Sequence, residues 1–206
     1  MSSRVVLATR NEHKVVEVRR IFAAAAVDVE LVGLDAFPDA PDVAETGLTF
    51  EENALLKARV IAHRTGLPTI ADDSGLAVDV LGGMPGIFSA RWSGRHGDDA
   101  ANLELLLAQL VDVADADRGA AFVCAAALAT PDGAEDVVRG ELRGSIATQP
   151  RGTNGFGYDP VFVPDGEVRT TAEMAPAEKD AISHRGLAFR ALARRLGGAD
   201  TTGTVR

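Results

Sequence analysis

The chain has 206 residues, of which 46% are hydrophobic and 25% are charged, so it can fill a core and is globular rather than disordered. Its 30 acidic and 21 basic residues give a net charge of −9, which disfavours nonspecific binding to nucleic acid. The single cysteine, Cys124, cannot form a disulfide within the chain, which fits a reducing compartment. We find no signal-peptide core and no run of about 18 apolar residues, so we expect a cytoplasmic protein without a membrane span.

The N-terminal segment predicts a strand that leads into a helix. A buried strand is expected over residues 4–8, followed by a helix with an apolar face between Val15 and Phe22. Asn11 is a natural N-cap for this helix. Residues 9–14 therefore lie at a helix N-terminus, where backbone N–H groups and the charge of Lys14 can bind an anion. A capped helix start without a ligand explains the same pattern equally well.

A second strand over residues 29–32 and an acidic loop over 33–44 precede another helix. Thr49 and Glu52 have the spacing of a capping box, so this helix is expected to begin after Thr49 and to end near Thr65, before Gly66. Its polar positions face either a cleft or, more commonly, solvent. These positions are Glu51, Asn53 and Lys57.

Two adjacent carboxylates, Asp72 and Asp73, follow the apolar run of residues 68–70. Neighbouring side chains of a strand point to opposite faces, so both can reach one cleft only if the chain bends there. Gly75 favours such a bend. Hard oxygen ligands beside a turn suit a magnesium ion. The sequence Asp-Asp-Ser-Gly is also good chemistry for a solvated turn, so the pattern alone does not decide.

The middle of the chain predicts a long loop, a helix and a hairpin. Residues 81–94 have many glycines and no periodicity, so we expect a structureless loop that is functional or mobile. A Trp92 that only pins this loop to the core is an equally good interpretation. Asp98 is expected to cap the next helix. Strands over 121–129 and 135–142, joined by a turn, predict an antiparallel hairpin that contributes to a second lobe.

A second unusual stretch is the glycine-rich segment 151–160. Phe156 offers a face on which a base can stack, and Asp159 offers an acceptor, although a glycine-rich turn with a core Phe is an equally good interpretation. A strand over 161–163 and a single helix over 176–196 follow. We take residues 1–198 as a single two-lobed domain and 199–206 as a frayed tail.

The candidates form three groups that together suit a nucleoside triphosphate and its magnesium. The phosphate binders are residues 9–14, Lys57 and Lys179; the metal ligands are Glu45, Asp72 and Asp73; the base cradle is residues 156–159, His184 and Arg185.

Seven short motifs carry a resemblance to a known family. They are residues 9–14 (Thr-x-Asn-x-x-Lys), 45–54 (Glu-Thr-Gly-x-Thr-Phe-x-Glu-Asn-Ala), 71–76 (Ala-Asp-Asp-Ser-Gly-Leu), 81–86 (Leu-Gly-Gly-x-Pro-Gly), 89–91 (Ser-Ala-Arg), 155–160 (Gly-Phe-Gly-Tyr-Asp-Pro) and 183–186 (Ser-His-Arg-Gly). Each motif is weak alone, but their joint order and spacing are specific. Together they resemble the inosine triphosphate pyrophosphatase family, the Ham1/RdgB-like purine nucleoside triphosphate pyrophosphatases, over nearly the whole chain.

The resemblance implies an α/β fold with an elongated mixed central sheet flanked by helices, and an active-site cleft between two lobes. It implies magnesium-dependent hydrolysis of dITP, ITP and XTP to the monophosphate and pyrophosphate, which cleanses the nucleotide pool. It further implies a homodimer that binds a small nucleotide. The net charge and the lack of a long apolar run, and not the resemblance, are the reasons to expect a cytoplasmic protein that binds neither nucleic acid nor a membrane.

Residue by residue, the resemblance implies that Asp73 is the catalytic carboxylate, which activates water and contacts Mg²⁺. Glu45 and the neighbouring Asp72 would be further metal ligands. The implied substrate-binding residues are Thr9, Arg10, Asn11, Glu12, His13, Lys14, Lys57, Ser74, Phe156, Gly157, Tyr158, Asp159, Lys179, His184 and Arg185. The chief departure from the family pattern is Trp92, where an aromatic residue such as Tyr is more usual.

The preference for hypoxanthine and xanthine over adenine has a physical explanation in this scheme. Hypoxanthine and xanthine carry an oxygen at position 6, where adenine carries an amino group, so donors such as Arg185 would pair only with the former. Two alternatives stay open: a pyrophosphatase for other modified nucleotides, and a nucleotide-binding sensor without turnover.

Overall fold

A computed structural model describes residues 3–198, so the expected tail at 199–206 lies outside the described residues. The chain divides into two compact units. Unit 1 comprises Met1–Asp73, Cys124–Gly140 and Arg185–Arg206, and unit 2 comprises Ser74–Val123 and Glu141–His184. Because the chain passes from one unit to the other within three strands, β3, β5 and β6 each contribute residues to both.

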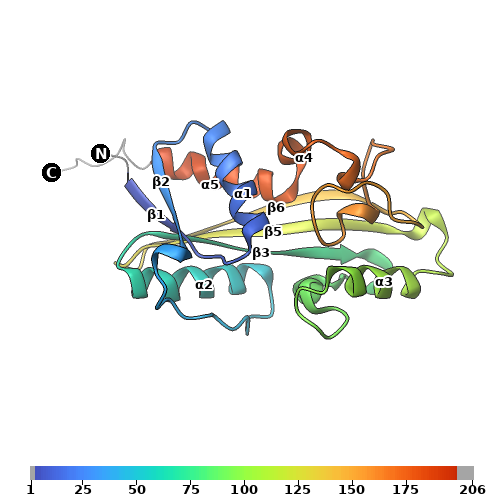
Figure 1. Cartoon of the computed structure of the whole chain (residues 1–206), viewed down its shortest axis with the longest axis horizontal. Helices are drawn as coiled ribbons and strands as arrows, with labels where there is room; N and C mark the ends of the chain where they lie inside the picture. The colour runs from blue at the N-terminus through green and yellow to red at the C-terminus, as the bar shows by residue number, and fades with distance from the viewer. Residues whose placement is uncertain (1–2, 199–206) are drawn as a thin grey trace. The chain divides into compact units, whose positions relative to one another are not determined.

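The strands form a mixed sheet in the order β2-β1-β3-β5-β6-β7, with β4 paired to β3. β1 pairs in parallel with β2 and β3, whereas β3–β4 and β6–β7 are antiparallel. The strands are β1 (Ser3–Leu7), β2 (Val29–Gly33), β3 (Thr69–Val78), β4 (Met84–Pro85), β5 (Gly119–Ala129), β6 (Glu135–Ile146) and β7 (Phe162–Pro164). Helices accompany these strands (Figure 1), which confirms the predicted α/β class with a mixed sheet.

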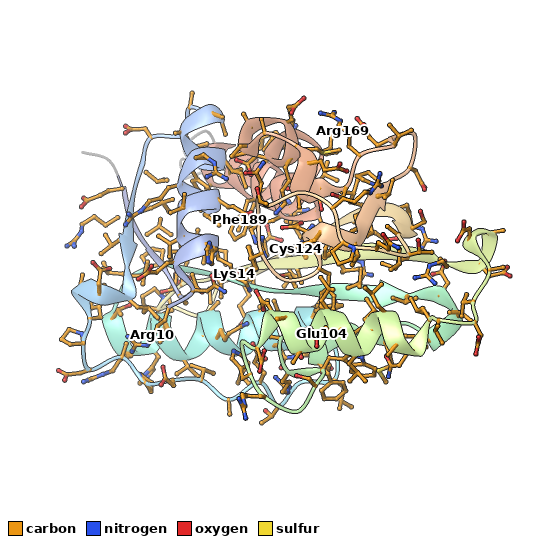
Figure 2. All side chains as sticks on the ribbon, turned by 45° about the vertical axis from the view of Figure 1, so that its right-hand side comes forward. Arg10, Lys14, Glu104, Cys124, Arg169 and Phe189 are labelled. Carbon is orange, nitrogen blue, oxygen red and sulfur yellow. The ribbon has the colours of Figure 1, made fainter. Side chains whose placement is uncertain are left out.

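Unit 1 carries helices α1 (Glu12–Ala24), α2 (Phe50–Thr65) and most of α5 (His184–Gly198). Figure 1 shows α1 and α5 on one side of the strands of this unit and α2 on the other. α1 and α5 pack on β1, β3 and β5 through a buried apolar cluster. Phe189 and Cys124 belong to this cluster, and both are labelled in Figure 2.

The predicted helix ends of unit 1 are confirmed. Asn11 caps α1 and Thr49 caps α2, and Gly66 ends α2 in the left-handed conformation with φ 68°. The capping box of α2 differs in one bond, because Glu52 accepts the backbone N–H of Leu48 at 2.6 Å. None of the described helices is both long and apolar enough to cross a membrane.

Unit 2 contains α3 (Asp99–Gln109), which Asp98 caps as predicted, and α4 (Pro176–Ile182). Leucines of α3 pack against residues of β3, β5, β6 and β7. The expectation of a structureless loop over 81–94 is wrong. Two 3-10 helices, Asp79–Leu81 and Gly86–Arg91, flank β4, and Trp92 Nε1 donates to Gln109 Oε1 at 2.9 Å, which ties this segment to α3.

The single helix predicted over 176–196 is also wrong, because the chain breaks at Ser183. This residue has φ −63° and ψ 150°, an extended conformation that ends α4 before α5 begins at His184. Serine favours such a position, since it competes poorly inside a helix and well at its ends. The break places His184 and Arg185 in the first turn of a new helix.

Candidate active site

β3 runs unbroken through Asp72, Asp73 and Gly75, so the expected bend at Gly75 is wrong. Gly75 serves close packing instead. A Cβ at this position would lie 2.4 Å from the carbonyl oxygen of Gly86 and 2.4 Å from Ser89 Oγ. Because the strand is unbroken, the two carboxylates alternate across it as a period of two requires.

Asp72 lies on the face of unit 1 that α1 and α5 cover. Its Oδ2 is 2.9 Å from Lys14 Nζ and 3.5 Å from Arg185 Nε, and its side chain is fully buried. Arg185 also pairs with the buried Glu17 of α1. Burial would raise the pKa of Asp72, but the charges of Lys14 and Arg185 hold it well below its usual range. Asp72 is therefore a permanently charged part of a buried ion-pair network.

Asp73 contacts α2, on the opposite face. Its Oδ2 accepts from Asn53 Nδ2 at 3.1 Å, and its Oδ1 lies 3.5 Å from Lys57 Nζ. Lys57 donates to Glu45 Oε1 at 3.0 Å, so two carboxylates share one lysine. Burial raises the pKa of Asp73 and the charge of Glu45 adds to this effect, which outweighs the opposing influence of Lys57. Asp73 thus has the greater affinity for a proton of the two aspartates.

This donor set fits a magnesium ion. Asp73 and Glu45 supply hard carboxylate oxygens, and together they place more negative charge around Lys57 than one lysine neutralises. Among residues 3–198, no group of three or more His, Cys, Asp or Glu side chains is arranged to hold a metal. Magnesium suits such a small set, because it usually takes one or two protein carboxylates and completes its shell with water and substrate phosphates. Asp72 faces the other side of β3.

Lys57 carries a full charge at this position. Burial would lower its pKa, but the charges of Asp73, Asp72 and Glu45 raise it above the ordinary value. A charged lysine between Asp73 and Glu45 keeps the two carboxylates together and can contact a phosphate oxygen.

The predicted phosphate segment follows β1 and enters α1. Thr9 and Lys14 are partly buried, whereas residues 10–13 are exposed. Asn11 accepts from the backbone N–H of Lys14 at 3.2 Å and donates its own backbone N–H to Thr9 Oγ1 at 3.2 Å. Arg10 turns to Asp42, 2.9 Å away. The segment is therefore a capped helix start beside a lysine, and an anion at its first turn would meet the positive end of the helix dipole.

In unit 2, the segment 156–159 is organised by Asp159, which is 2% exposed. Its Oδ2 accepts from the backbone N–H of Phe156 at 2.9 Å and from Lys179 Nζ at 2.6 Å. Its Oδ1 accepts from Thr171 Oγ1 at 2.8 Å. These contacts make Asp159 the anchor of the turn, a role different from that of an acceptor for a base.

Unit 2 also holds several contacts of aromatic side chains. Lys179 Nζ lies 5.4 Å from the centre of the Phe156 ring. His184 stacks on Phe122 with ring centres 4.8 Å apart and an interplanar angle of 13°. Tyr158, buried, donates its hydroxyl to the carbonyl oxygen of Ser89 at 2.9 Å.

The remaining predicted residues are placed as follows. Gly157 donates its backbone N–H to Asp99 Oδ2 at 2.9 Å, and Ser74 is a partly buried residue of β3. Arg185, predicted to donate to the base, instead extends to Asp72 and Glu17 in unit 1.

Sequence reasoning missed Glu17 and Thr171, and it left Asn53 without a role. Glu17 had a readable signal, because it lies three residues after Lys14 and next to Val18, on the buried face of α1. Asn53 had a weaker signal in the sequence. It is a short amide in the first turn of a helix, between two acidic residues and an apolar stripe. Thr171 had none, since its partner Asp159 is distant in sequence.

Comparison with known proteins identifies the relatives of this chain. The model of the Ham1 family matches residues 5–195. A dITP/XTP pyrophosphatase from Streptomyces avermitilis is 67% identical over 190 residues, covering 92% of this chain and 95% of that protein. The crystal structure of a nucleoside-triphosphatase / dITP/XTP pyrophosphatase from Mycobacterium abscessus is 58% identical with a TM-score of 0.76, covering 94% and 98% of the two chains. The Staphylococcus aureus Ham1 protein is 40% identical with a TM-score of 0.85, covering 96% and 100%.

Proposed function

Because the chain belongs to the Ham1 family, we propose that it hydrolyses the non-standard purine nucleoside triphosphates dITP, ITP and XTP. The products are the nucleoside monophosphate and pyrophosphate. Removing these triphosphates keeps deaminated bases out of newly made nucleic acid.

One observation carries the proposal: Asp73 is a buried carboxylate with a raised pKa, next to Glu45 and Lys57. A structural carboxylate in a core is normally neutralised by its partners, as Asp72 is. A carboxylate with an elevated proton affinity beside cationic groups is typical of a general base.

In this mechanism Asp73 takes a proton from a water molecule whose oxygen attacks the α-phosphorus. The bond from the α-phosphorus to the bridging oxygen breaks, and pyrophosphate leaves with that oxygen. Lys14, Lys57 and the backbone N–H groups at the start of α1 bind the phosphates and neutralise their charge. Thr9 and Asn11 shape this segment, and Ser74 binds substrate beside Asp73.

Asp73 and Glu45 would hold the magnesium ion of this reaction, which when bound would neutralise phosphate charge and act as a Lewis acid. Asp72, the third expected metal ligand, lies on the other side of β3. Its charge is already balanced by Lys14 and Arg185, so we assign it to the positioning of these two cations.

Recognition of the base is assigned to unit 2. The ring of Phe156 offers a stacking face, and Lys179 and His184 offer donors to an oxygen at position 6 of a purine. A donor that pairs with this oxygen loses its partner when the base carries an amino group there, and unpaired donors discriminate by several orders of magnitude. Arg185, also expected as a donor to the base, contacts Asp72 and Glu17 in unit 1.

The proposal extends to the assembly and its location. The family resemblance supports a homodimer in the cytoplasm, and the net charge of −9 disfavours a role on nucleic acid. Light scattering of the purified protein measures the assembly directly, with a mass of two chains expected.

A substrate panel tests the function. Pyrophosphate and orthophosphate release are measured from dITP, ITP, XTP, dATP, dGTP and modified pyrimidine triphosphates, with magnesium and with EDTA. We expect pyrophosphate from dITP, ITP and XTP, and none when the metal is chelated. Preference for a pyrimidine triphosphate would favour the alternative pyrophosphatase, and tight binding of dITP without pyrophosphate would favour the sensor.

A further inference from the structure

Asn53 connects the two carboxylates assigned to the metal. It is fully buried in the first turns of α2. Its Nδ2 donates to Asp73 Oδ2 at 3.1 Å, and its Oδ1 accepts the backbone N–H of Gly47 at 2.7 Å. Gly47 lies two residues after Glu45 in the same loop. One amide therefore touches the catalytic carboxylate with one end and the loop that carries Glu45 with the other.

The loop is pressed against this amide. A Cβ on Gly47 would lie 2.8 Å from Asn53 Oδ1 and 2.7 Å from Glu52 Cβ, so only glycine allows the approach. Glu52 accepts the N–H of Leu48, and Thr49 caps the helix. The loop after Glu45 is thus held by the first turns of α2 at consecutive positions.

The same local device occurs in unit 2 without a carboxylate. Asn102 is the fourth residue of α3, as Asn53 is the fourth residue of α2, and both helices have a side-chain N-cap. Asn102 Oδ1 accepts the backbone N–H of Ser93 in the preceding loop at 2.7 Å, and its side chain is also buried. Within the described part of the chain, however, Asn102 Nδ2 has no hydrogen-bond partner.

Comparing Asn53 with Asn102 separates two roles of such an asparagine, docking of the preceding loop and donation to a carboxylate. An asparagine at this position docks the preceding loop onto its helix, which Asn102 and Asn53 both do. Only Asn53 also donates to an aspartate, and its donation fixes which oxygen of Asp73 faces away from Lys57. We infer that Asn53 is a positioning residue that sets Asp73 and Glu45 in register for metal binding and for proton transfer. This inference rests on the proposed function.

Alanine variants of the two asparagines test the inference as a matched pair. Both Asn53→Ala and Asn102→Ala remove a buried acceptor of a loop N–H, so both should lower the melting temperature by a similar amount. Asn53→Ala should also lower kcat for dITP by about 10- to 100-fold and weaken Mn²⁺ binding by a similar factor, with KM nearly unchanged. Asn102→Ala should keep wild-type kcat and Mn²⁺ affinity. Mn²⁺ binding is measured without nucleotide, from the electron paramagnetic resonance of the free ion.

Asn53→Asp provides a second variant if the alanine protein does not fold. It keeps an acceptor for Gly47 but replaces the donor with a carboxylate beside Asp73, so the loop contact survives while kcat falls. Equal kcat and Mn²⁺ affinity in the folded Asn53 and Asn102 variants would overturn the inference. It is also wrong if neither Asn53 variant folds while Asn102→Ala does, because the role is then structural. Wild-type protein that releases no pyrophosphate from dITP would instead refute the proposed function.

Discussion

Asp73 in unit 1 and Asp159 in unit 2 are both buried carboxylates, yet their partners differ. Asp159 accepts short hydrogen bonds from Lys179, Thr171 and the backbone of Phe156, at 2.6, 2.8 and 2.9 Å. Asp73 accepts a bond of 3.1 Å from Asn53 and lies 3.5 Å from Lys57, which it shares with Glu45. The hydrogen bonds of Asp159 hold the turn of residues 156–159 in place. Asp73 instead has a raised pKa, so it can take a proton.

The contrast recurs within two neighbouring residues of β3. Asp72 has a lowered pKa because Lys14 and Arg185 overcome the effect of burial, whereas Asp73 has a raised one. Strand alternation alone sends the two side chains to different helices. A difference in chemistry thus follows from a one-residue step along an unbroken strand.

The largest expected effect on stability is that of Asp72→Asn. The substitution leaves Lys14 and Arg185 with less negative charge in a buried network, so the free energy of unfolding should fall by about 3–5 kcal/mol. Urea unfolding at neutral pH measures it. An unchanged free energy of unfolding would show that Asp72 does not stabilise the fold.

The difference in free energy of unfolding between wild type and Asp72→Asn should depend on pH in a definite direction. The pKa of Asp72 is lower in the folded protein than its ordinary value. The stabilisation is therefore present above the ordinary aspartate pKa, about 3.9, and is lost as pH falls toward the folded value. The stability difference between wild type and Asp72→Asn should be constant near neutrality and shrink in acid. A difference that grows in acid contradicts this assignment.

Asp159→Asn is expected to have a smaller effect, about 1.5–3 kcal/mol on unfolding, because one charged acceptor of Lys179 and Phe156 is lost. Since these contacts hold the stacking face, KM for dITP should rise while kcat changes little. Denaturant unfolding and steady-state kinetics measure both. A loss of kcat with unchanged KM and stability would place Asp159 in the chemistry and remove the contrast with Asp73.

Asp79→Asn is expected to have the smallest effect. Asp79 is exposed and lies 2.6 Å from Arg143 on the surface of unit 2. Such pairs contribute less than about 1 kcal/mol because solvent screens them. Thermal unfolding and pyrophosphate release should both match wild type. A large loss of thermal stability or of pyrophosphate release in Asp79→Asn would contradict the account. It would mean that an exposed aspartate matters as much as the buried Asp72 and Asp159.

Local rules predicted the parts of this fold that depend on neighbouring residues. The caps at Asn11, Thr49 and Asp98 and the helix end at Gly66 follow from side chains within a few positions of the helix terminus. The family resemblance supplied the role proposed for Asp73, and the raised pKa now gives that role a physical basis.

Tertiary contacts decided the features that the sequence did not predict. Gly75 predicts a bend, but close packing against Gly86 and Ser89 is what requires a glycine here, within an unbroken strand. The sequence predicts that Arg185 donates to a ligand. In the structure it forms a buried ion pair with Glu17, which lies on a helix far away in the sequence.

The most direct test of the central claim is pyrophosphate release from dITP by Asp73→Asn, measured together with its free energy of unfolding. Replacing a buried carboxylate of raised pKa by a neutral amide should not lower the free energy of unfolding, because burying that charge is unfavourable. The account predicts a folded protein whose rate is lower by about 10²- to 10⁴-fold. A folded Asp73→Asn protein with the wild-type rate would contradict it.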